Sequence, residues 1–128
     1  MTDFIEVYDN ALSADFCREL ITLFDKSPYK TAGRTGGGVD TTKKLSTDLY
    51  LYQHQEYQAQ MQVIWQATTR YVAEYFRKYH FALIGPVAMT IPHPQTGAPV
   101  AITHDNFAQF GEPRLMDFIR MLYQIGPV

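Results

Sequence analysis

The sequence is poor in cysteine and has no uninterrupted hydrophobic run long enough to cross a membrane. Cys17 is the one cysteine among 128 residues, so an internal disulfide and a cysteine-based zinc cluster are both excluded. The longest uncharged stretch, Phe81 to Thr103, is broken repeatedly by proline and glycine and is predicted to be loop and hairpin. A lone free thiol is typical of a reducing compartment, so we expect a cytoplasmic protein with no membrane partner.

A strong charge of either sign is also lacking. The formal net charge of −2 creates no field that would collect polyanions, so nucleic acid is not an expected partner. Acidic residues at positions 3, 6 and 9 stand where a signal peptide would carry basic ones, and we expect no signal peptide here. With 46% hydrophobic and 19% charged residues, the composition is that of one ordinary globular domain.

The first 26 residues carry two local patterns. The run Phe4, Ile5, Val7, Tyr8 predicts a short strand that ends at the turn-forming pair Asp9-Asn10. Ser13 is a suitable N-cap for a helix that runs to about Lys26. Because helical spacing places Cys17 on one apolar face, we expect this thiol to be inert and packed in the core; the face consists of Phe16, Cys17, Leu20, Ile21 and Phe24.

A glycine-rich, basic segment from Thr31 to Ser46 is expected to be a mobile surface loop. Glycine N–H groups followed by Lys43 and Lys44 are features of phosphate-binding loops. A P-loop is nevertheless not predicted, because Val39-Asp40 follows the last glycine where that motif requires Lys-Ser/Thr. The part from Gly33 to Lys44 is therefore either a lid over a substrate or a plain connection.

Periodicity predicts the remaining elements. Alternation from Leu45 to Tyr52 predicts a half-buried strand, and an aromatic stripe from Tyr57 to Tyr79 predicts a long helix that braces a sheet. His80, at the end of that helix, is expected to complement its last carbonyl groups. The runs Val87 to Ile91 and Pro99 to Thr103 predict the two strands of a hairpin. A last short helix is predicted to start near Pro113, with an apolar side made of Leu115, Phe118, Ile119 and Leu122. The predicted fold class is α+β, with helices bracing a small, mostly antiparallel sheet.

The amino-acid sequences of several segments resemble those of a known family. FIEVYDNALSADFCRELITLFD and GRTGGGVDTTKKLSTDLYL, with HPQTGAPVAIT and LYQIGP further along, resemble the N-terminal segment of bacterial prolyl-hydroxylase-like oxygenases that depend on iron(II) and 2-oxoglutarate. The resemblance implies a parent protein with a helix-braced double-stranded β-helix, Fe(II) and 2-oxoglutarate as cofactors, and hydroxylation of an unidentified substrate, a protein side chain being one candidate. It also implies that residues 1–128 are a single domain or the truncated N-terminal portion of a longer oxygenase domain.

The family's metal signature is a His-x-Asp/Glu pair, a distant histidine and a later cation that holds 2-oxoglutarate. His54-Gln55-Glu56, His104 and Arg114 occur in this order. We interpret the match as accidental, because the β-helix that holds such ligands needs about eight strands, and only two or three are readable here. No metal or cofactor is thus expected on this chain, and its catalytic and cofactor-binding residues stay unassigned.

Two functions follow as hypotheses. The first is a support segment of such an oxygenase that is inactive on its own. The alternative is a non-catalytic interaction module that pairs with itself, as a homo-oligomer, or with another protein through an unpaired sheet edge.

Overall fold

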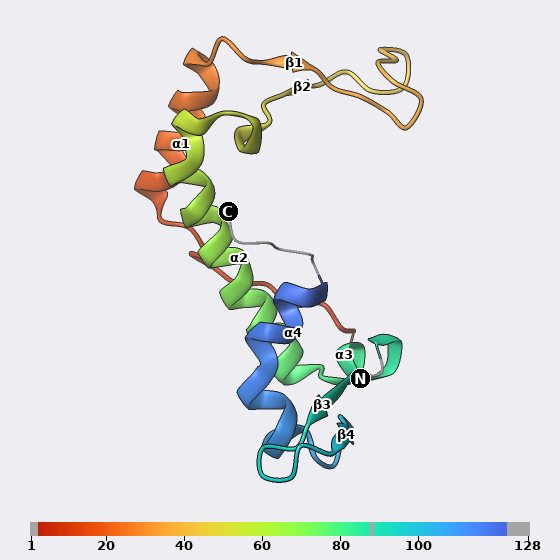
Figure 1. Ribbon diagram of the computed structural model, residues 1–128. Helices are drawn as coiled ribbons and strands as arrows, with labels where there is room; N and C mark the ends of the chain where they lie inside the picture. Colours follow the sequence, from red (N-terminus) through yellow and green to blue (C-terminus); the bar gives the residue numbers. More distant parts are fainter. Residues whose placement is uncertain (1–2, 88, 123–128) are drawn as a thin grey trace. The chain divides into compact units, whose positions relative to one another are not determined.

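The computed structural model describes residues 3–87 and 89–122 (Figure 1). Four α-helices and two small antiparallel sheets occur in this part of the chain, which confirms the α+β class. Short turns of 3-10 or π geometry connect several of them. In chain order the helices and strands are α1 (Ala14–Lys26), β1 (Thr31–Ala32), β2 (Thr47–Asp48), α2 (Gln58–Lys78), α3 (Phe81–Val87), β3 (Thr90–Pro92), β4 (Pro99–Ala101) and α4 (Leu115–Leu122).

The chain divides into two compact units. We call Asn10–Ala67 the loop unit, and Met1–Asp9 together with Thr68–Val128 the core unit. The boundary falls within α2, so this helix contributes its first half to one unit and its second half to the other.

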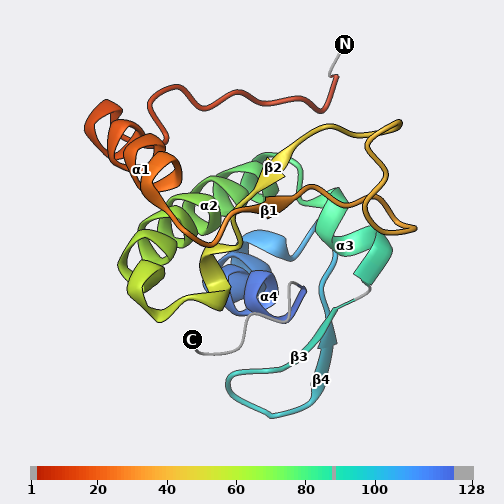
Figure 2. The same ribbon diagram turned by 90° about the horizontal axis from the view of Figure 1, so that it is seen from above.

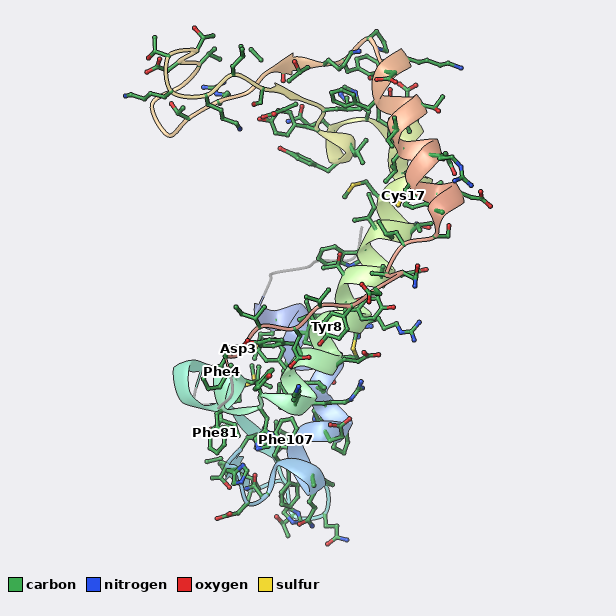
Figure 3. All side chains as sticks on the ribbon, turned by 180° about the vertical axis from the view of Figure 1, so that it is seen from behind. Asp3, Phe4, Tyr8, Cys17, Phe81 and Phe107 are labelled. Carbon is green, nitrogen blue, oxygen red and sulfur yellow. The ribbon has the colours of Figure 1, made fainter. Side chains whose placement is uncertain are left out.

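Helix α1 of the loop unit confirms the predicted start and end. The Ser13 hydroxyl accepts a 3.1 Å hydrogen bond from the Phe16 amide, and the helix ends one residue before Ser27. The expectation for Cys17 is wrong, because its side chain is exposed (Figure 3). The half-buried side of α1 carries Phe16, Leu20 and Phe24, and Cys17 lies about 100° round the helix from Phe16.

The glycine-rich segment is more ordered than a plain loop. Strands β1 and β2 pair antiparallel, with Thr31 opposite Asp48 (Figure 2). The Gly33 amide donates a 2.8 Å bond to the Ser46 carbonyl, and a Cβ at Gly33 would collide with the Ser46 hydroxyl, so a larger residue there would force the Ser46 side chain to move. The strand predicted from Leu45 to Tyr52 is formed only at Thr47 and Asp48. Leu45 is exposed, and a 3-10 turn begins at Leu51.

The hydrophobic core of the molecule lies in the core unit. Its members come from the second half of α2, from α3, from the β3–β4 hairpin and from α4, with a π-helical turn at Phe107–Gly111 between the hairpin and α4. The predictions of the long helix and the last helix are confirmed. The hairpin is confirmed too, but its first strand is Thr90–Pro92, and the predicted start at Val87 belongs to α3. Helix α3 and the π turn were not predicted. The buried residues are Ala73, Leu83, Met89, Ile91, Ile102, Phe107, Leu115, Phe118 and Ile119.

The uncharged stretch from Phe81 to Thr103 begins as helix α3 and then forms the hairpin, so its interpretation as loop and hairpin was wrong for the first part. Within the described residues, no helix combines the length and the hydropathy needed to cross a membrane.

The strand predicted at the start of the chain is not formed. Residues 4–8 have no strand assignment, and Phe4 has a positive φ of 60°. We call residues 3–8 the N-terminal strap; it lies along the C-terminal half of α2, as the labelled Phe4 and Tyr8 show in Figure 3. The apolar run that predicted a strand therefore has a helix as its partner.

Candidate functional site

The residues with the order of an iron signature are divided between the two units. His54 and Glu56 belong to the loop unit, whereas His104 and Arg114 belong to the core unit. Among residues 3–87 and 89–122 there is no group of three or more His, Cys, Asp or Glu side chains that could hold a metal ion. We derive no iron chemistry from these residues.

His54 packs among aromatic rings at the end of α1. Its imidazole stacks on Tyr29, with ring centroids 4.0 Å apart and planes inclined by 14°, and Tyr57 meets both rings edge-on. A hydrogen bond to Glu56 raises the pKa of Tyr29, and the negative charge of that carboxylate adds to the effect. This arrangement explains His54 and Glu56 by packing and hydrogen bonding.

Ser27 accepts hydrogen bonds from two residues of the same cluster. Its hydroxyl accepts a 2.8 Å hydrogen bond from the Tyr57 hydroxyl and a 3.2 Å bond from the Tyr29 amide. Both Ser27 and Tyr57 are buried, so each polar group needs the other as its partner.

Two histidines of the core unit face each other. His80 follows α2 and His104 follows β4; the Nε2 atom of His80 is in direct contact with Nδ1 of His104. The rings are nearly parallel, at 17°, with centroids 4.6 Å apart. Phe107 stacks on His80 and Phe81 on His104, so aromatic rings restrain both imidazoles (Figure 3 labels the two phenylalanines).

His80 makes this contact shortly after the end of α2, where it was expected to complement the last carbonyl groups. The Nδ1 atom of His80 is buried and has no hydrogen-bond partner within the described part of the chain. Sequence reasoning missed the pair, although the predicted hairpin was a usable signal, since a hairpin brings its two flanking segments together.

The strap is held to α2 by a charged and aromatic cluster. Lys78 forms an ion pair with Glu6, and the Tyr79 hydroxyl donates a 2.5 Å bond to the same carboxylate. The hydrogen bond from Lys78 and then that from Tyr79 lower the pKa of Glu6, while Glu6 raises the pKa of both partners. The Tyr75 hydroxyl also donates to the Phe4 carbonyl, at 2.8 Å.

Both lysines of the Gly33 to Lys44 loop form ion pairs, one with an aspartate of the loop and one with an aspartate of β2. Lys43 lies 3.4 Å from Asp40, and Lys44 lies 3.7 Å from Asp48. Hydrogen bonds from the Thr42 hydroxyl and amide lower the pKa of Asp40, which favours its charged form. Both lid and plain connection stay open as interpretations of this loop.

No protein-family model matches the sequence, and neither does any curated protein or solved structure. The candidate sites therefore rest on geometry alone. Two arrangements offer chemistry: the facing imidazoles of His80 and His104, and the carboxylate of Glu6 between a lysine and a tyrosine.

Proposed function

We propose that the chain is the N-terminal support of an oxygenase dependent on iron(II) and 2-oxoglutarate, and that it does not hold the iron itself. The resemblance of residues 4–51 to that family supports the proposal. In this interpretation, a double-stranded β-helix outside these residues binds both cofactors and hydroxylates the substrate, for which a protein side chain remains one candidate.

One structural observation carries the proposal. Tyr57 is the one hydrophobic side chain that is buried among residues 10–67, all of which the structure describes. Helix α1 buries none of its residues, although Phe16, Leu20 and Phe24 form an apolar side. A unit with so few buried side chains gains little stability from its own core, so a covering surface is expected. A catalytic β-helix would supply that surface.

Anaerobic titration with Fe(II) and 2-oxoglutarate tests the first half of the proposal. We expect no iron uptake that depends on 2-oxoglutarate. Uptake of one Fe(II) per chain, lost in both His54→Ala and His104→Ala, would overturn it, because those residues would then form the site that their order suggests.

The reading frame and the intact mass of the natural protein test the second half. We expect the frame to continue past Val128 into a His-x-Asp/Glu segment. A native stop codon at that point, together with a natural product of the mass of these 128 residues, would contradict a support role.

The second candidate is an interaction module that pairs through a sheet edge. It is favoured by the two-stranded sheets, since each of β1–β4 has one strand partner within the described residues and leaves an edge open. The strands have only two or three residues, and Pro92 and Pro99 remove amide donors from the β3–β4 hairpin, so these edges are short. Sedimentation analysis tests pairing of the chain with itself, and a monomer at high protein concentration contradicts that form of the candidate.

A further inference from the structure

Two ring nitrogens, one of His80 and one of His104, face each other at contact distance. Each neutral imidazole has one N–H and one lone pair, so two facing nitrogens are satisfied only when one hydrogen or one cation lies between them. Two facing lone pairs repel. The contact therefore has two candidate occupants, a shared proton or a metal ion.

Imidazole nitrogens are good ligands for zinc, nickel and copper, which bind at the lone pair of a neutral ring. We propose that His80 and His104 bind a divalent ion of this group through Nε2 of His80 and Nδ1 of His104. The two rings must separate slightly to admit the ion, and water completes its coordination.

The surroundings of the pair favour such a site. Phe107 stacks on His80 with centroids 4.7 Å apart, and Phe81 stacks on His104 at 4.5 Å, so neither ring turns away freely. His104 is exposed, which leaves a path for the ion and its water ligands. The histidines come from segments on either side of the β3–β4 hairpin, so a bound ion would link the end of α2 to the segment after β4.

One feature limits the expected affinity. Ligation through Nε2 of His80 places its hydrogen on Nδ1, which is buried without an acceptor among the described residues. Ligating histidines usually donate this second N–H to a carboxylate or carbonyl group. We therefore expect binding that is clear but weaker than in a closed site with three or four protein ligands.

Titration calorimetry of the full chain with ZnCl2 and with NiCl2 tests the proposal. We expect one ion per chain, at least a tenfold loss of affinity in His80→Gln and in His104→Gln, and unchanged affinity in His93→Gln. His93 is a matched control because its Nδ1 already accepts bonds from the Gln95 and Thr96 amides. Absence of binding to the wild-type chain, or equal binding by His104→Gln, overturns the proposal.

His104→Gln carries the test if His80→Gln fails to fold, because His104 is exposed and His80 lies against buried Phe107. A circular dichroism spectrum of each variant establishes that it is folded. Zinc should also raise the melting temperature of the wild-type chain and leave that of His104→Gln unchanged, and an equal rise in both contradicts the site. Because His104 also belongs to the order tested by the iron titration, His54→Ala distinguishes the two sites. It should leave the zinc affinity unchanged, and a loss of zinc binding in His54→Ala contradicts the site at His80 and His104.

Discussion

The Tyr79 hydroxyl donates a 2.5 Å hydrogen bond to the carboxylate of Glu6, which lies 73 positions earlier in the chain. Lys78 contacts the same carboxylate oxygen, and the Phe4 ring packs on Tyr79 with centroids 5.4 Å apart. The strap is thus held by side chains of α2 and not by the ladder of a sheet. Ile5 and Val7, which alternate with these contact residues, are 70% and 79% exposed.

Acid should release the strap. The pKa of Glu6 is lowered, first by the hydrogen bond from Lys78, so the carboxylate binds its proton less readily in the folded chain than in the unfolded one. Its stabilising contribution is therefore full above the ordinary value of 4.5 and is lost as the pH falls through the lower folded value. We expect the difference in melting temperature between wild type and Glu6→Gln to shrink as the pH falls below 4.5.

Asp9→Asn is the control for this experiment, because it removes an equal charge from a neighbouring position. A change with pH in this variant as large as that of Glu6→Gln would show a general charge effect and not the Glu6 contacts. A Glu6→Gln difference that grows on acidification would contradict the role of the carboxylate.

The buried pair of Tyr57 and Ser27 should be worth about 1 kcal/mol. Tyr57→Phe removes the donor of the 2.8 Å bond and should lower the free energy of unfolding by about 0.5–1.5 kcal/mol. Ser27→Ala should cost about 1–3 kcal/mol, because it leaves the tyrosine hydroxyl buried without its acceptor. Urea unfolding of both single variants and the double variant gives the coupling energy, and strictly additive losses would refute the interaction.

The core should depend most on α4. Ile119 is fully buried, so Ile119→Ala leaves a cavity and should lower the free energy of unfolding by about 2–5 kcal/mol. Met121, two residues later on the same helix, is 61% exposed. Met121→Ala should change the stability by less than about 0.5 kcal/mol. Equal losses in the two variants, measured by denaturant unfolding, would show that the core is placed wrongly.

Ser13 should stabilise α1 as its N-cap. Ser13→Ala removes the acceptor of the Phe16 amide and should cost about 1 kcal/mol, whereas Ser13→Asn retains a side-chain oxygen and should cost little. The helical signal of circular dichroism, followed during thermal unfolding, measures both variants. An alanine variant as stable as the asparagine variant would contradict the cap.

Local signals predicted the elements that depend on local chemistry. Ser13 marked the start of α1, the aromatic stripe marked α2, and Pro99 marked the hairpin strand. The strap shows the limit of such signals, because its apolar run does not specify whether the partner is a strand or a helix. Leu45 begins the alternation that predicted the second strand, yet its side chain is 88% exposed, since nothing in the loop unit covers it.

The candidate site was less accessible to sequence reasoning. The order of His54, Glu56 and His104 suggested a metal site, but order along a chain does not determine which side chains meet in space. The predicted hairpin brings the segments of His80 and His104 together, but no motif specifies that these two side chains meet. For Cys17, the helix period placed the thiol on an apolar face. Only the side of α1 with Phe16, Leu20 and Phe24 is half-buried, and the Cys17 side chain is exposed.

The uneven distribution of buried side chains also has a consequence for fluctuations. Amide protons of α3 and α4 are shielded by the core and exchange with solvent only when that core opens. Amide protons of α1 and of the β1–β2 pair lie in a unit with one buried hydrophobic side chain, so small local openings suffice to release them. Deuterium labelling would therefore separate the chain into a slow population and a fast one, with the transition inside the single helix α2.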